Sequence, residues 1–226
     1  MSSDKWYLVL RLEGPLQSWG FDSQYNRRNT GLIPTKSAIA GICCAALGWP
    51  RGSQMEEKFL ASFEALRMTA IAIPRNAAKK ELPVRRLEDF HTVQHTRRAS
   101  GAINSDCVLT RRYYLADAAF GVLVEGDKIL LGEIAVALAN PRWGVWLGRK
   151  TCIPSAPVLA GLTENRKDAL LILIGDEPLE SFTRQEDAEE FTEGRDSIPD
   201  TPVSFATERR LFSPRRVLTL WGKERI

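Results

Sequence analysis

The chain has 226 residues, 44% of them hydrophobic and 26% charged, which suits one domain with a sizeable core or one domain with a large insertion. No stretch approaches the roughly 18–20 consecutive apolar residues of a membrane-spanning helix. The first residues also lack the pattern of a secretory signal, so we expect a cytoplasmic protein that does not enter a membrane. The four cysteines form no C-x-x-C pair, which argues against a zinc site, and we expect no cofactor.

Charges are separated along the chain, although the net charge is only +3. Residues 75–112 hold nine lysines and arginines against four acids, residues 164–200 hold twelve acids against four bases, and residues 205–226 are basic again. Such segregation favours an anionic partner on one face of the protein. The alternative, that solvated faces merely differ in sign, stays open on charge alone.

The first half of the chain predicts a strand, two helices and a second strand. Alternating leucines indicate a strand over 6–12 with one buried face. A helix over 35–47 follows a Pro-Thr entry and ends at Gly48, which is typical of a helix stop. A second apolar stripe predicts a helix over 55–66, and a short strand follows over 68–73.

Residues 75–111 are polar and basic, without regular spacing. Because so long a loop is unusual in a compact domain, we expect a projecting hairpin or arm there. Beyond it, the patterns predict a strand over 113–124 and a helix over 130–139. The continuous apolar run ALLILI predicts a buried strand over 169–174, and the last strand is expected over 216–221.

Without the insertions the order is strand, helix, strand, strand, helix, strand. This order predicts an α+β, ferredoxin-like βαββαβ fold, with a four-stranded antiparallel sheet and helices on one face. The open face of such a sheet is a common platform for RNA. We expect a single domain over 1–226, with a basic hairpin insertion over about 75–112 and an acidic, then basic, C-terminal region over about 164–226.

The first motif is GPLQSWG at 14–20. It is followed by Arg27-Arg28 and by PTKS at 34–37. The free N–H groups at a helix start, with Lys36 beside them, favour a phosphate. The motif is not a Walker A loop, because G-x-x-x-x-G-K-[ST] is absent, and we expect no nucleotide hydrolysis. The alternative is a Ser/Thr helix cap with Trp19 packed under a loop.

The second motif is the basic arm itself, where arginine pairs alternate with flat rings. The pairs are Arg85-Arg86, Arg97-Arg98 and Arg111-Arg112, and the rings are Phe90, His91, His95, Tyr113 and Tyr114. Arginine makes bidentate hydrogen bonds to phosphate oxygens, and aromatic rings stack on unpaired bases. The combination therefore suits single-stranded RNA. The alternative is that the rings belong to the core, and we expect Tyr113 or Tyr114 to be buried.

The third motif is NPRWGVWLGRKTCIP at 140–154. Arg142, Arg149 and Lys150 lie there among glycines and two tryptophans, and such a loop lets the protein backbone approach a nucleic-acid backbone closely. A structural loop anchored by its tryptophans is an equal alternative.

Catalysis has little support in the sequence. His91 and His95 are the only histidines, and no H-E-x-x-H or G-x-S-x-G motif occurs. Metal-independent RNA cleavage needs a general base and a cation. Either histidine, with Tyr25 and Lys36 or an arginine, could supply them, so a metal-independent endoribonuclease is the alternative function.

The chain resembles the CRISPR-associated protein 5 (CasD-type) family of type I-E Cascade, in the RAMP superfamily. The segments that carry the resemblance are LRLEGPLQSWG, PTKSAIAGICCAALG, RLEDFHTVQHTRR, TRRYYLADAAFGVLV and NPRWGVWLGRKTC, within residues 6–154. The resemblance implies a ferredoxin-like body with a thumb that folds over the guide, and a grip on the 5′ handle of the crRNA. It also implies contacts with the backbone subunit CasC and the large subunit CasA, and target DNA met through the complex in antiviral interference.

Relatives in other type I systems cut pre-crRNA with a tyrosine, a lysine and a histidine. No Lys-His neighbour pair occurs in the arm here, which argues against self-processing. The leading hypothesis is therefore a non-catalytic RNA-binding subunit, and a protein-only scaffold is a third, weaker hypothesis. The residues expected to contact RNA are Gln17, Trp19, Arg27, Arg28, Lys36, Ser37, His91, Gln94, Arg97, Arg98, Arg111, Arg112, Tyr114, Arg142, Arg149 and Lys150.

Overall fold

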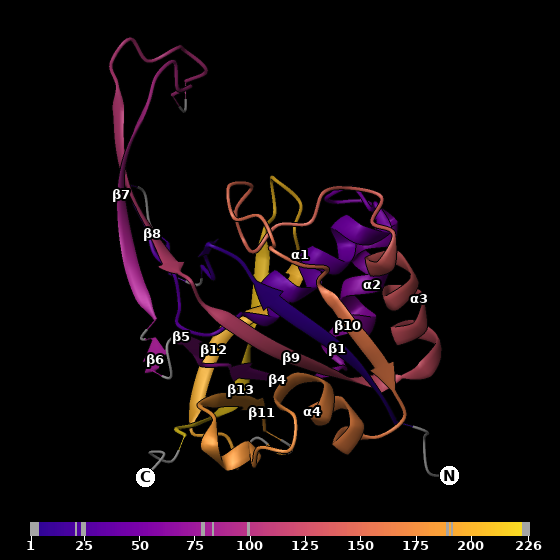
Figure 1. Cartoon of the computed structure of the whole chain (residues 1–226). Coiled ribbons are helices and arrows are strands. Elements are labelled where there is room, and N and C mark those ends of the chain that lie inside the picture. Colours follow the sequence, from indigo (N-terminus) through magenta and orange to yellow (C-terminus); the bar gives the residue numbers. More distant parts are fainter. Residues whose placement is uncertain are drawn as a thin grey trace.

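The computed structural model describes residues 5–20, 22–23, 26–77, 80–82, 84–98, 100–188, 190 and 192–222 (Figure 1). The strands are β1 (Lys5–Glu13), β2 (Leu16–Gln17), β3 (Arg27–Arg28), β4 (Arg67–Ala72), β5 (Arg75–Ala77), β6 (Lys80–Leu82), β7 (Arg85–Val93), β8 (Val108–Ala116), β9 (Ala119–Asp127), β10 (Leu159–Thr163), β11 (Arg184–Asp187), β12 (Asp196–Ser204) and β13 (Leu211–Leu220). The helices are α1 (Lys36–Leu47), α2 (Gln54–Glu64), α3 (Lys128–Ala139), α4 (Arg166–Ile174) and the short 3-10 helix η1 (Leu179–Ser181). None of these helices combines the length and the apolar character that crossing a bilayer takes.

The protein has a mixed α+β structure, as predicted, built around one large sheet. The strand order in this seven-stranded sheet is β10-β1-β9-β4-β11-β13-β12, and all neighbouring strands are antiparallel. Strand β1, next to the edge strand β10, pairs with β9 along its whole length. The last strand, predicted over 216–221, is part of this sheet as β13.

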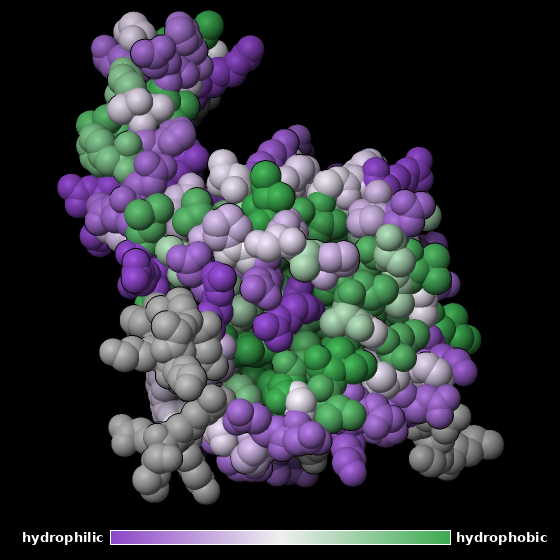
Figure 2. All heavy atoms as spheres, viewed as in Figure 1, coloured by the Kyte–Doolittle hydropathy of each residue, from purple (hydrophilic) through white to green (hydrophobic). Residues whose placement is uncertain are grey.

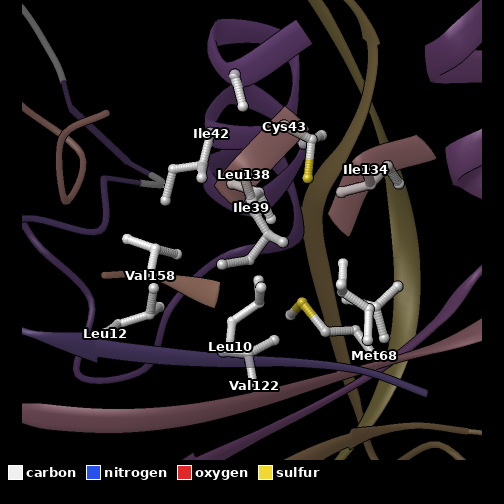
Figure 3. Close-up of a cluster of buried hydrophobic side chains, with 14 of the residues drawn as sticks. Leu10, Leu12, Ile39, Ile42, Cys43, Met68, Val122, Ile134, Leu138 and Val158 are labelled. Atoms are coloured by element: carbon white, nitrogen blue, oxygen red, sulfur yellow. The ribbon is translucent and has the colours of Figure 1, made fainter. Parts of the chain in front are cut away.

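Three helices cover one face of the sheet. Side chains of α1 and α3 meet those of β1 and β9 in the main core (Figure 3). The residues that Figure 3 labels there include Ile39, Ile42 and Cys43 of α1, Ile134 and Leu138 of α3, Leu10 and Leu12 of β1, and Val122 of β9. The predicted apolar stripes of the first two helices are confirmed, since Ile39, Ile42, Cys43 and Ala46 in α1 and Phe59, Leu60 and Phe63 in α2 are buried.

The first helix begins and ends where its sequence indicates. The Thr35 side chain accepts a hydrogen bond from the N–H of Ala38, which satisfies one free donor of the first turn. At the other end, Gly48 takes a left-handed conformation with φ 73°, which suits glycine because it has no Cβ. These two caps explain why the helix spans residues 36–47.

Residues 169–174 are not the buried strand that we predicted; they belong to α4. A short apolar run fits either a buried strand or a buried helix, and periodicity alone does not separate the two. The Asn165 side chain caps the helix by accepting from the N–H of Asp168. Ala169 and Leu173, four residues apart, are then buried, while Leu171 is exposed. The strand beside β1 is instead β10, which the hydrophobic pattern did not indicate.

The other face of the sheet is not an open platform over its central strands, so that expectation is wrong. A second apolar cluster lies there, which joins α4 and the end of η1 to the sheet. Its buried members are Val9, Ile71, Leu123, Ala169, Leu173 and Phe182. Because these side chains cover the sheet, its face over β1, β9 and β4 is not available as a platform.

The predicted strand over 113–124 is in fact two strands, β8 and β9, in different sheets. The chain turns between them at Asp117, whose φ of 55° is left-handed. Strand β8 continues away from the body and pairs with β7 to form a projecting hairpin, which we call the arm (Figure 1). Figure 2 shows the arm standing clear of the body, with hydrophilic and hydrophobic side chains on its surface.

Candidate functional site

A cavity of about 680 Å³ opens beside the first turn of α1. Its walls come from α1, the loop between α1 and α2, the loop after α3, and the turn between β12 and β13. We call it the basic cavity, because its lining includes Arg28, Arg51, Arg149, Lys150 and Arg210. Its volume is within the range of small-ligand sites.

The basic cavity combines positive charge with aromatic rings. The rings in its lining are Trp49, Trp143, Trp146, Phe205 and Phe212. Two acids also line it, but both are buried: Asp200 pairs with Arg215, and Glu56 accepts a hydrogen bond from the N–H of Gly52. The charge that faces the opening is therefore positive, which suits an anion that also carries flat rings.

The loop after α3 is held on the body by one glycine and one arginine. Gly148 has φ 95°, and a Cβ there would overlap the carbonyl oxygen of Ser18. Arg149 donates to the backbone oxygens of Tyr113 (3.1 Å) and Arg28 (2.8 Å), and its guanidinium lies 4.6 Å from the centre of the Tyr114 ring. Arg149 thus fastens the loop to the base of the arm.

The base of the arm gathers arginines from segments far apart in sequence. Strand β3 runs parallel to β8, with Arg27 opposite Arg111 and Arg28 opposite Arg112. Strand β8 also carries Tyr113, and the guanidiniums of Arg27 on β3 and Arg86 on β7 are 5.9 and 5.2 Å from the centre of its ring. Since Arg28 also lines the basic cavity, the positive surface continues from the cavity onto the arm.

The outer arm carries the remaining predicted contacts on exposed positions. His91, Gln94, Arg97 and Arg98 are all exposed. Arg98 donates to the side chain of Asn104 at 2.8 Å. Neighbouring residues of a strand point to opposite sides, so β8 directs Arg111 and Arg112 to different faces of the arm. Arg111 lies 3.6 Å from Glu88, and Arg112 donates to Thr110.

Three of the residues predicted to contact RNA are buried in the body, where RNA does not reach them. Gln17 is fully buried, and its amide donates to the carbonyl oxygens of Leu12 and Ala118. Trp19 is fully buried with its ring edge-on to Phe120, which confirms the alternative of a tryptophan packed under a loop. Tyr114 is 4% exposed and lies against the guanidinium of Arg149. This confirms the expectation that Tyr113 or Tyr114 is buried.

Lys36 is also buried. Its position at a helix start suggested a phosphate contact, but its side chain points into the body. Its ammonium donates to the carbonyl oxygens of Glu64 (3.0 Å) and Leu66 (2.5 Å) and lies 3.4 Å from Asp187. Burial lowers the pKa of Lys36 below its ordinary value, and the charge of Asp187 offsets this only in part. An anion in the basic cavity cannot reach this ammonium.

Arg215 completes the buried ion cluster around Lys36. Its guanidinium bonds to Asp187, Asp200 and Gln185. Burial by itself lowers the pKa of Arg215, but the hydrogen bond with Asp200 and the charge of Asp187 outweigh it, so the pKa is raised. Asp200 also accepts from the N–H of Lys36, which ties β12 to the start of α1.

Ser37 and Arg142 differ in their position relative to the basic cavity. Ser37 is half-buried and lines the basic cavity. Arg142 is exposed outside the cavity lining, and its backbone N–H donates to the carbonyl oxygen of Ala46 at the end of α1. Of the sixteen predicted contacts, the structure thus brings Arg28, Ser37, Arg149 and Lys150 together in the cavity.

Of the groups proposed for RNA cleavage, the histidines and Lys36 lie within the described residues and do not share a site. His91 is exposed on the arm, 3.5 Å from Asp89, whereas the ammonium of Lys36 is enclosed in the body. Tyr25 lies outside the described residues. Within the described residues, no group of three or more His, Cys, Asp or Glu side chains could hold a metal ion.

Two arginines that line the cavity, Arg51 and Arg210, were missed in the sequence. Arg51 follows Pro50 in the turn between α1 and α2, and Arg210 precedes β13. The available signal was the positive charge of residues 205–226, but nothing in the sequence indicated that this segment returns to α1.

Comparison with known proteins decides the family. The model of the CRISPR-associated protein family Cas5 (Cas_Cas5) matches residues 7–218. The chain belongs to the Cas5 family. It is 31% identical over 177 residues to the CRISPR system Cascade subunit CasD of Escherichia coli (strain K12), covering 76% of this chain and 78% of that protein.

Two solved structures agree with the Cas5 assignment. A chain of a CRISPR RNA-guided surveillance complex is 29% identical with a TM-score of 0.74, covering 96% of this chain and 90% of that chain. A Cas protein crystal structure is 33% identical with a TM-score of 0.65 and covers 97% of each chain. The resemblance inferred from residues 6–154 is thus confirmed, and the Cas5 match also includes most of the C-terminal region.

Proposed function

We propose that the chain is a non-catalytic subunit of a type I-E Cascade surveillance complex that grips the 5′ handle of the crRNA in antiviral DNA interference. The observation that carries the proposal is the continuous positive surface from the basic cavity to the arm. Arg28 and Arg149 belong to both parts. Kinship with a Cascade subunit and with a chain of an RNA-guided complex supports it.

In this proposal, the body is one ferredoxin-like RAMP domain and the arm is its thumb. The order β10-β1-β9-β4 supports the first part, because it places the four core strands of a βαββαβ chain as 4-1-3-2. The projection of β7 and β8 supports the second. The thumb folds over the guide beside the backbone subunit CasC, and the body contacts the large subunit CasA, with target DNA met through the assembled cytoplasmic complex.

Single-stranded RNA fits this surface better than a duplex does. Rings and arginines alternate at the cavity and at the arm base, and a duplex would hide its bases from the rings. Lys150 lies 5.9 Å from the centre of the Trp146 ring, and both line the cavity. Phosphates bind the cations while unpaired bases stack on exposed rings such as Trp143.

The test is salt-dependent binding of labelled repeat RNA to the full chain. We expect Arg28→Gln with Lys150→Gln to weaken binding and to reduce the slope of log Kd against log[NaCl] by roughly 0.7 per lost phosphate contact. Lys58→Gln with Lys167→Gln, a matched pair on α2 and α4 outside the cavity lining, should leave both quantities unchanged. Equal effects of the two pairs would contradict the proposed site.

The non-catalytic part has a separate test. Repeat RNA incubated with the chain in EDTA should remain intact, because His91 and Lys36 do not share a site. Site-specific cleavage that His91→Ala abolishes would instead establish the endoribonuclease alternative.

A further inference from the structure

Arg51 and Arg210 line the basic cavity from two turns that carry none of the predicted RNA contacts. Both side chains are exposed. The two turns touch, because a Cβ added to Gly52 would lie 3.1 Å from the Cβ of Ala206. Two cations are therefore held close together by parts of the backbone that pack against each other.

The two guanidiniums repel one another. The pKa of Arg210 is lowered by partial burial and, secondly, by the charge of Arg51. Across the described residues, the structure shows no ion pair or side-chain hydrogen bond for either arginine. Arg210 is supported instead by the ring of Phe212, with its guanidinium 5.3 Å from the ring centre. An anion between the two arginines would remove the repulsion.

The surroundings indicate which anion fits. Ser37 and Ala38 of the first turn of α1 also line the cavity. The N–H groups of Lys36 and Ala38 already bond to Asp200 and Thr35, so this turn offers the hydroxyl of Ser37 rather than free N–H groups. Trp143, 44% exposed, offers a ring for stacking beside the charges. A phosphate with a base next to it uses both features, whereas the carboxylates of an acidic peptide would leave the rings without a partner.

We propose that Arg51 and Arg210 form a second subsite, which binds one backbone phosphate of single-stranded RNA after the strand has passed Arg28 and Lys150. This subsite rests on the proposed function, since it extends the same RNA path across the cavity. Part of the RNA contact would then come from Arg210, in the segment before β13, which belongs to none of the three motifs of the sequence.

The test uses the full chain and repeat RNA in which one phosphate at a time is replaced by an uncharged methylphosphonate. Binding is measured by fluorescence anisotropy at several salt concentrations. Arg51→Gln with Arg210→Gln should weaken binding about tenfold or more, as expected for charged hydrogen bonds. One particular methylphosphonate should weaken the wild type similarly and the double variant hardly at all, which identifies the bound phosphate.

The control is Arg209→Gln, next to Arg210 and outside the cavity lining, which should bind like the wild type. The double variant should keep or raise its unfolding temperature, because the mutual repulsion is gone. Arg210→Lys shows whether the planar fork matters or only the charge.

The outcomes separate the two proposals. If the wild-type chain does not bind repeat RNA, the proposed function fails and the subsite fails with it. If the wild type binds and the double variant binds equally well, only the subsite is wrong. Unchanged RNA binding with lost binding of a poly-glutamate peptide would assign the two arginines to an acidic protein segment.

Discussion

Lys36 and Arg51 are both cations near the start or end of α1, yet the structure gives them opposite roles. The ammonium of Lys36 is enclosed by two carbonyl oxygens and Asp187, while Arg51 is exposed at the basic cavity. Their neighbours along the chain do not explain this difference. Groups from the end of α2, the residue before β4 and the end of β11 surround Lys36, whereas Arg51 lies exposed in the turn between α1 and α2.

Lys36→Met tests this assignment at the level of a single side chain. We expect it to lower the free energy of unfolding by about 3 kcal/mol, because removing one partner leaves other buried charges less compensated. Urea unfolding measures the change. Lys150→Met, on an exposed lysine, should leave stability unchanged and weaken RNA binding. A stable Lys36→Met variant with reduced RNA affinity would show that the original prediction was right.

At the scale of elements, α4 replaces the predicted strand and covers the sheet. Leu171 and Leu173 distinguish the two descriptions, because residues two apart share a face in a strand but not in a helix. In the structure Leu173 is 5% exposed and Leu171 is 51% exposed.

The matched substitutions in α4 should therefore differ. Leu173→Ala removes buried methyl groups over β9 and should cost about 3 kcal/mol. Leu171→Ala should change stability by less than about 0.5 kcal/mol. Thermal or urea unfolding compares the two, and similar losses for both would favour the strand.

Gly148 is the equivalent test for the loop after α3. Its positive φ and its contact with Ser18 leave no room for a Cβ. Gly148→Ala should cost about 1–3 kcal/mol of strain and should weaken RNA binding by displacing Arg149 and Lys150.

Gly132→Ala in α3, with nothing within 4 Å of the new methyl group, serves as the control for Gly148→Ala. It should stabilise the protein by up to about 1 kcal/mol and leave RNA binding unchanged. A harmless Gly148→Ala would mean that the loop is not held in this way.

At the scale of the whole molecule, the arm contributes little to the fold. Its outer half is exposed on both faces, and a hairpin of this kind is marginal in water without a further layer. We infer that the arm exists for contacts outside this chain.

Shortening the arm tests this inference. Val93 pairs with Val108, so Asn-Gly can replace residues 94–107 as a two-residue turn. The unfolding temperature should stay within a few degrees of the wild type, while affinity for repeat RNA should fall. Loss of the cooperative unfolding transition would show that the arm supports the body.

Local signals in the sequence determined a large part of this protein. The helix caps at Thr35 and Gly48, the stripes of α1 and α2 and the strand β1 follow from patterns a few residues long. Such patterns reflect local sterics and hydrophobic periodicity, which act wherever the segment lies. The family was also readable from motifs in residues 6–154, as the match over 7–218 confirms.

Only the tertiary structure decided which charges face solvent and which segments meet. Burial of Lys36, Gln17 and Trp19, and the cavity that joins Arg51 to Arg210, depend on contacts between residues far apart in the chain. The run ALLILI at 169–174 is compatible with a helix or a strand. The helix is favoured because the Asn165 side chain caps it and Leu173 packs against the sheet. Long-range packing decides such cases, because it sets burial and pairing for residues whose own chemistry allows either outcome.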